Sequence, residues 1–129
     1  MAILRRVLKL QAVLWAAFGL VLLAVPGLLL EEVFEVEEGP GDVWLRMAGV
    51  MGVVLAMLMV LVAQRVLDVW WWTWAFAILE AGVATLAILE AVSGDPPSWP
   101  WWALGGSAVL FLLLDLIGLA RAERERPFA

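Results

Sequence analysis

Few side chains in this sequence could do chemistry, and the most conspicuous are carboxylates inside apolar stretches. Glu80 lies near the middle of the apolar run Val69–Val92, and Asp115 lies within residues 101–120. A charged group inside a bilayer is costly, so such residues either have a partner or indicate a function. The chain has no Cys and no His, which removes thiolate and imidazole chemistry. We therefore predict no catalytic residue, no metal site, no cofactor and no enzymatic activity.

The composition indicates a membrane protein. Of the 129 residues 65% are hydrophobic and only 16% are charged, far from the balance of ordinary globular chains. Apolar runs of about 20 residues match the thickness of the hydrocarbon layer. We predict an all-α fold, an antiparallel four-transmembrane-helix bundle, formed by residues 1–129 as a single domain with spans at 8–29, 43–63, 69–91 and 101–120. The lipid bilayer is the expected partner, and the net charge of −5 excludes a basic nucleic-acid-binding surface.

The first apolar run has two interpretations. The basic start Met1–Lys9 followed by Leu10–Leu30 is also typical of a signal peptide. The run is too long for a signal-peptide core and no A-x-A cleavage site follows, so we predict a retained first helix. The acidic segment Glu31–Asp42 lacks the spacing of a calcium loop and is expected to be a solvated connection. Its pattern does not decide between a helix end and a short strand.

Basic residues predict the orientation. In the four-span arrangement all of them except Arg46 fall on one side, and the positive-inside rule then places both termini in the cytoplasm, for a protein expected to be integral to a plasma (inner) membrane. Eight tryptophans occur near the ends of the spans, as expected for side chains that prefer the headgroup zone. They are Trp44, Trp99, Trp101 and Trp102 on the outer side and Trp70–Trp72 and Trp74 on the inner side. The residues on the cytoplasmic side are Arg5, Arg6, Lys9, Arg65, Arg121, Arg124 and Arg126.

Helical periodicity predicts which face of the third span is buried. At 100° per residue Glu80 shares a face with small residues, and small residues normally face neighbouring helices in membranes. Bulky Ile78, Leu86 and Leu89 lie on the opposite face. The predicted buried face contains Thr73, Ala77, Glu80, Ala84, Ala87 and Ala91.

The second span has its own small-residue stripe. Ala48, Gly52 and Ala56 recur at every fourth position with Gly49 beside them, which allows close approach of another helix. The short segment Gln64–Asp68 predicts a tight connection, so that the second and third spans form a hairpin.

Depth along the spans predicts polar partners. Arg46 and Glu90 fall near the outer ends of the second and third spans, and we predict a structural intramembrane ion pair between them. Gln11 and Asp115 should share a level in the inner half. Glu80 lies near mid-depth, where its candidate polar neighbours are Ser107, Thr85 and Asp115. These four residues are the candidates for ligand or proton binding, with structural hydrogen bonding as the alternative for Glu80.

Some features resemble the DoxX-like superfamily of small bacterial four-helix membrane proteins. The resembling features are Phe18-Gly19 to Pro26-Gly27 in the first helix, the acidic loop, and Arg46-x-x-Gly49 opening the second helix. The resemblance implies a four-helix membrane fold, and some members resemble accessory subunits of membrane oxidoreductases. The absence of Cys argues against a redox role for this chain itself.

Two functions follow as hypotheses. The first is a non-enzymatic scaffold or accessory subunit that forms a homo-oligomer or part of a larger membrane complex. The second is a small-solute or proton-coupled transporter, or a ligand-binding membrane protein, that uses Glu80. The size is similar to that of small multidrug-resistance transporters, but their membrane carboxylate lies in helix one, where this chain has Gln11.

Overall fold

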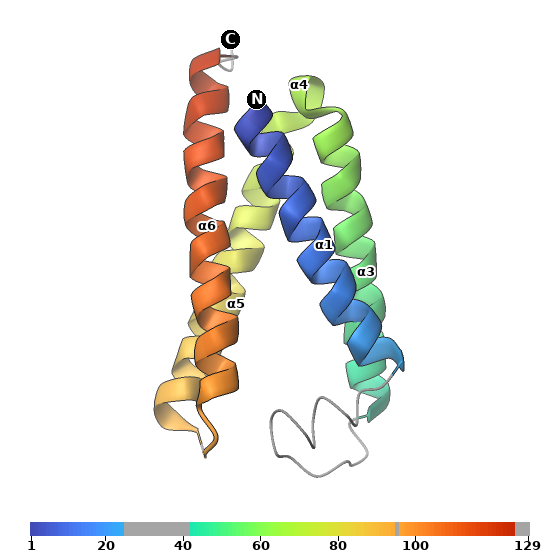
Figure 1. Cartoon of the computed structure of the whole chain (residues 1–129), viewed down its shortest axis with the longest axis vertical. Helices are drawn as coiled ribbons and strands as arrows, with labels where there is room; N and C mark the ends of the chain where they lie inside the picture. Colours follow the sequence, from blue (N-terminus) through green and yellow to red (C-terminus); the bar gives the residue numbers. More distant parts are fainter. Residues whose placement is uncertain (25–41, 95, 126–129) are drawn as a thin grey trace.

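The computed structural model is a bundle of four long helices, which confirms the predicted fold class (Figure 1). It describes residues 1–24, 42–94 and 96–125. The long helices are α1 (Ala2–Ala24), α3 (Asp42–Gln64), α5 (Thr73–Ser93) and α6 (Trp99–Glu125), and the short elements α4 (Val66–Val69) and η2 (Trp70–Trp72) connect α3 to α5. All four spans are long and apolar enough to cross a membrane. The acidic segment 31–41, predicted span residues 25–29 and Arg126 lie outside the described residues.

The helices alternate in direction, and contacts of α1 with the ends of α3 and α6 close one end of the bundle. The N-terminus, α4 and the C-terminal end of α6 lie together at what we call the α4 end (Figure 1). There the N-terminal amine of Met1 pairs with Glu125 at 2.7 Å. The Arg5 Nε donates to the carbonyl of Ala63 at 3.1 Å, which satisfies one of the carbonyls at the end of α3.

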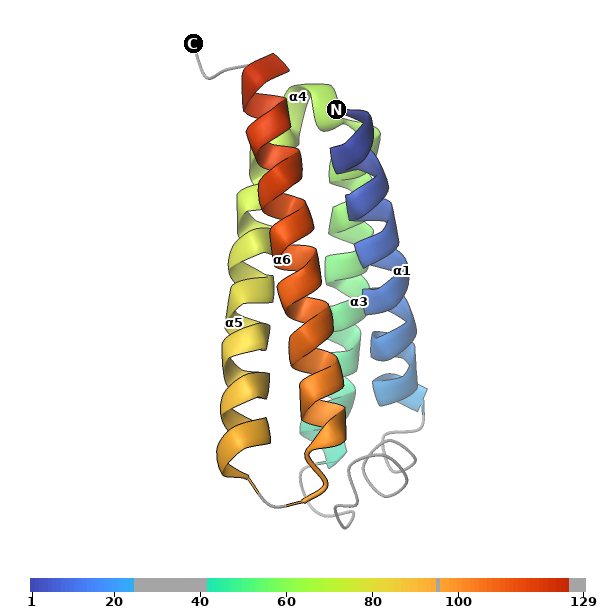
Figure 2. The same ribbon diagram turned by 60° about the vertical axis from the view of Figure 1, so that its left-hand side comes forward.

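The packing divides the molecule into two helical pairs. α1 packs mainly on α3, and α5 mainly on α6, while α1 also touches α6 and α3 barely touches α5. The two pairs lie close at the α4 end and diverge toward the opposite end in Figure 1, and Figure 2 shows α1 alongside α3 and α5 alongside α6. The sequence predicted a hairpin between the second and third spans, but these two helices belong to different pairs.

The connection between α3 and α5 also differs from the prediction of one tight loop followed by a continuous helix. Arg65 leaves the helical conformation, Val66–Val69 forms a single turn, and Val69 leaves it again before η2. Trp70 is buried in the core, whereas Trp71 and Trp72 are exposed. The α-helix proper therefore begins only at Thr73, after a bend that directs one of three consecutive indoles inward.

The apolar core occupies the half of the bundle nearest the α4 end. It combines the first half of α1 with the second half of α3, the start of α5 and the last turns of α6. Its members include Leu4, Leu8, Met59, Val66, Trp70, Phe76 and Leu119. The predicted buried face of α5 is confirmed, since all six of its residues are buried while Ile78, Leu86 and Leu89 are 59–71% exposed.

Glycines set the distance between α1 and α3. A Cβ built on Gly49 would lie 2.6 Å from the carbonyl oxygen of Gly19 and 2.7 Å from the backbone nitrogen of Leu23. A Cβ on Gly19 would likewise meet the backbone of α3 at 2.7 Å. The predicted small-residue stripe is thus used within the chain through Gly49, Gly52 and Ala56, whereas Ala48 is exposed.

We expect Gly49→Ala to destabilise the protein by about 1–3 kcal/mol, because the added methyl meets backbone atoms that cannot rotate away. Gly82→Ala is the matched control, since a Cβ there meets nothing within 4 Å and alanine favours the helix. Denaturant unfolding in mixed micelles measures both variants. Equal stability of the two would contradict the close packing of α1 on α3.

Candidate functional site

A buried polar cluster joins α1, α5 and α6 near the middle of the bundle. Its members are Gln11 on α1, Glu80 on α5 and Asp115 on α6, and each is at most 2% exposed. The Gln11 amide nitrogen donates to Glu80 Oε1 at 2.9 Å and to Asp115 Oδ2 at 3.1 Å. One side chain of α1 therefore uses both of its N–H bonds to hold two carboxyl groups that come from the other helical pair.

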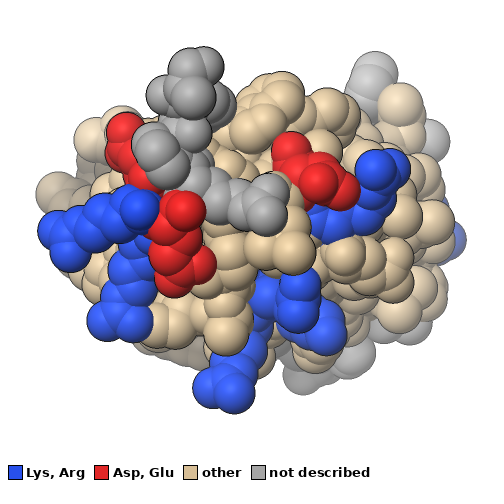
Figure 3. Space-filling model, turned by 90° about the horizontal axis from the view of Figure 1, so that it is seen from above, with Lys and Arg blue, Asp and Glu red and all other residues tan. Residues whose placement is uncertain are grey.

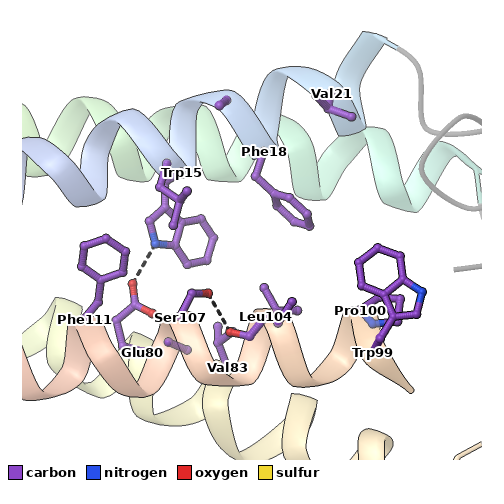
Figure 4. Close-up of a pocket in the computed structure, with 14 residues that line it drawn as sticks. Trp15, Phe18, Val21, Glu80, Val83, Trp99, Pro100, Leu104, Ser107 and Phe111 are labelled. Carbon is purple, nitrogen blue, oxygen red and sulfur yellow. Dashed lines mark hydrogen bonds between the residues drawn. The ribbon is translucent and has the colours of Figure 1, made fainter. Parts of the chain in front are cut away.

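Trp15 supplies a second donor to the same carboxyl group. Its indole Nε1 donates to Glu80 Oε1 at 2.9 Å, as Figure 4 shows. Gln11 and Trp15 are four residues apart and so lie on one face of α1. Both described hydrogen bonds to Glu80 end on Oε1, and among the described residues no hydrogen bond ends on Oε2.

Three buried polar atoms of the described residues have no hydrogen-bond partner. They are Gln11 Oε1, Asp115 Oδ1 and Thr73 Oγ1, and all three residues are fully buried. Buried polar atoms without a partner are rare in folded proteins and call for a specific explanation, such as a bound water or a proton. Two of these three belong to residues that already share a hydrogen bond, Gln11 and Asp115.

Glu80 also lies in the wall of a pocket of about 550 Å³, between α1 and the α5–α6 pair. The pocket occupies the half of the bundle away from the apolar core, where the two helical pairs diverge. Trp15 and Phe111 lie beside Glu80, Phe18 lies further along α1, and Trp99 lies at the far end (Figure 4). Several lining residues, among them Leu14, Val21 and Trp99, are exposed, so the pocket reaches the surface of the molecule.

Apart from the indole N–H groups of Trp15 and Trp99, the polar side-chain groups of the lining are those of Glu80 and Ser107. The Ser107 hydroxyl donates to the carbonyl of Leu104 at 2.9 Å in its own helix. Glu80 is therefore the polar group best placed to meet a molecule in the pocket. A large apolar and aromatic cavity with one precisely held polar group is the usual form of a small-molecule site.

The structure brings together some of the predicted site residues and separates others. Gln11 and Asp115 are at one level, as predicted, and Asp115 neighbours Glu80 through the Gln11 amide. Ser107 lines the pocket. Thr85 is exposed and donates to the carbonyl of Ala81 at 2.8 Å, so it takes no part in the cluster.

The predicted ion pair between Arg46 and Glu90 is wrong. The Arg46 guanidinium donates to the carbonyl of Leu23 on α1 at 3.1 Å, and Glu90 is exposed on α5. Among the residues the structure describes, the ion pairs join Met1 to Glu125 and Arg65 to Asp68, not Arg46 to Glu90. The physical reason is that α3 pairs with α1 and α5 with α6, so the far ends of α3 and α5 diverge.

Sequence reasoning missed Gln11 and Trp15 as partners of Glu80. A height estimate compares positions along the membrane normal but does not say which helices face each other. The available signal was the spacing of Gln11 and Trp15, two hydrogen-bond donors four residues apart in an apolar helix.

Comparison with protein-family models, with curated proteins and with solved structures gave no match to this chain. The class of the protein therefore rests on its own fold and site. It is a membrane-embedded four-helix protein with a pocket between its helices, and the carboxyl group of Glu80 lies in the wall of that pocket.

We expect Gln11→Leu to destabilise the protein by about 1–3 kcal/mol, since it leaves two buried carboxyl groups without their shared donor. Trp15→Phe removes one hydrogen bond and should cost about 0.6 kcal/mol, the average for such bonds in membranes. Thr85→Val is the control, because it alters an exposed hydroxyl outside the cluster. Denaturant unfolding in mixed micelles measures the free energy of unfolding of the three variants. A Gln11→Leu variant as stable as Thr85→Val would contradict the role of the Gln11 amide as the shared donor of the two carboxyl groups.

Proposed function

We propose that this protein is a non-enzymatic, ligand-binding membrane protein that holds a lipophilic molecule in the pocket beside Glu80. The observation that carries the proposal is the pocket itself: about 550 Å³, lined by apolar and aromatic side chains, with a buried carboxyl group in its wall. This volume suits a drug-sized molecule. Because exposed side chains form part of the lining, such a molecule has a route from the bilayer.

The rigid placement of Glu80 supports the same proposal. Two donors from α1 fix Oε1, and this leaves Oε2 for a further interaction. The neighbouring Trp15 ring is itself fixed by its hydrogen bond, so the aromatic wall and the carboxyl group form one preorganised surface. Preorganisation reduces the entropy lost when a ligand binds.

A scaffold or accessory subunit is the second candidate. Exposed apolar side chains on α3, including Met47, Met51 and Met57, favour contact with lipid or another membrane protein. The small-residue stripe that first suggested a partner packs on α1 instead, through Gly49 and Gly52. This second proposal includes membership of the DoxX-like superfamily. The residues of the Arg46-x-x-Gly49 feature that supports the resemblance, Arg46 and Gly49, both contact α1 in this structure.

A pocket-filling variant tests the ligand-binding proposal. Ala103 lines the pocket, so Ala103→Trp should fill it, whereas Ala75→Trp adds the same bulk on an exposed face of α5 outside the lining. The probe is a long-chain alcohol that carries a photoreactive diazirine, in lipid nanodiscs, with labelled residues mapped by mass spectrometry. We expect Ala103→Trp to reduce labelling of Phe18 and Phe111 by about tenfold relative to Ala75→Trp.

Labelling of the lipid-facing residues of α3 is the internal standard, and it should be the same in both variants. If the wild-type protein is labelled only on such exposed faces, the pocket does not take up a lipophile and the proposal is wrong.

We propose the cytoplasmic location of the α4 end from its charge. Exposed Arg6, Lys9, Arg65, Arg121 and Arg124 belong to this end, and Figure 3 shows basic side chains around it, with acidic ones between them. Excess Lys and Arg favour the cytoplasmic side of an inner membrane.

Because the chain has no cysteine, single substitutions report this orientation directly. In intact cells a membrane-impermeant maleimide should label Ser98→Cys but not Arg65→Cys, and lysis should make Arg65→Cys reactive. The reverse pattern would place the α4 end outside.

A further inference from the structure

The hydrogen bonds of the polar cluster can be accounted for atom by atom. The Gln11 amide has two N–H donors, and both are used, one on Asp115 Oδ2 and one on Glu80 Oε1. The acceptor of the same amide, Gln11 Oε1, has no partner, and neither has Asp115 Oδ1. Both atoms are fully buried acceptors as long as Asp115 is ionised.

A single proton on Asp115 Oδ1, shared with Gln11 Oε1, would give both of these atoms a hydrogen bond. A protonated carboxyl group and a primary amide form a cyclic pair, in which the amide N–H donates to one carboxyl oxygen and the carboxyl O–H donates to the amide oxygen. The first of these bonds is the observed 3.1 Å contact. Turning the amide over would present its oxygen to both Glu80 and Asp115, and two protons would then be needed instead of one.

Glu80 has a different environment. Its Oε1 accepts from both Gln11 and Trp15, two donors that stabilise a negative charge on this carboxyl group, and Glu80 lies in the pocket wall. From α1 it faces Gln11 and Trp15, and from α6 it faces Asp115 across the amide, while α3 barely touches α5. None of the residues that line the pocket is basic, and residues 25–41 include no Lys or Arg.

We propose that Asp115 holds the proton of this cluster and Glu80 its negative charge, so that the pocket selects a lipophilic organic cation. The inference deepens the proposed function and rests on it. An unpaired charge in the bilayer is costly, and a bound cation removes that cost. The rings of Trp15, Phe18 and Phe111 line the same pocket, and aromatic faces attract cations.

A pair of isosteric molecules tests the ligand class. The cation is phenylbutyltrimethylammonium, and its neutral isostere has a quaternary carbon in place of the nitrogen. Equilibrium dialysis against the full chain in a nonionic detergent measures both. We expect the wild-type protein to bind the cation at least about tenfold more tightly than the isostere. Lowering the pH should weaken the binding of the cation but not that of the isostere, because protonation removes the charge of Glu80.

Two isosteric variants locate the charge. Glu80→Gln should abolish the preference for the cation, whereas Asp115→Asn should keep it, since an asparagine amide reproduces both hydrogen bonds of a protonated Asp115 to Gln11. Ser107→Ala, in the pocket lining but outside the cluster, should also keep it. Thermal unfolding of each variant first establishes that it is folded.

Infrared spectroscopy of the same variants at neutral pH provides a readout that needs no ligand. The carbonyl band of a protonated carboxylic acid should be present in the wild type and in Glu80→Gln and absent from Asp115→Asn. A band that disappears in Glu80→Gln instead would overturn the assignment of the proton.

The outcomes separate the two proposals. If the cation and the isostere bind equally well, the pocket is a binding site but the cation inference is wrong. If neither binds the wild-type protein, the proposed function fails and the ligand class with it. If Asp115→Asn loses the preference for the cation as Glu80→Gln does, Asp115 acts through its charge and the assignment is wrong.

Discussion

The arrangement of this bundle depends on the Gln11 amide, because it is the donor that two buried carboxyl groups share. Glu80 and Asp115 lie on α5 and α6, while Gln11 and Trp15 lie on α1. Each helical pair thus contains only half of a hydrogen-bonded set. In a bilayer, where water cannot replace a missing partner, this division fixes the register of one pair against the other.

The two halves of the molecule along its length have different roles. Toward the α4 end the helices converge on a packed apolar core around Leu8, Met59 and Trp70. Away from it the pairs diverge, and the space between them is the pocket. The polar cluster lies at the boundary, so the packed half holds Glu80 in position and the diverging half leaves it accessible.

The sequence predicted the fold class and the buried face of α5 because both depend on local patterns. Apolar runs match the membrane thickness, and the periodicity around Glu80 places it on a face of small residues. The partners of Arg46 and Glu80 depend instead on which helices are neighbours. A stripe containing Gly49 indicates close packing but does not name Gly19 as its partner, so the Arg46–Glu90 pair was wrong and Trp15 was missed.

The pairing of the helices also has a consequence for the order of assembly. α1 and α3 are consecutive spans, and so are α5 and α6, so each pair can pack as soon as its own two spans have left the ribosome. Until α5 and α6 are made, the pair formed by α1 and α3 lies in the bilayer without the carboxyl acceptors of the Gln11 and Trp15 donors. Synthesis of α6 brings the last acceptor, Asp115, into the membrane. The polar cluster can therefore be completed only after α6 has entered the membrane, and a truncated chain that stops before α6 lacks the acceptor that completes it.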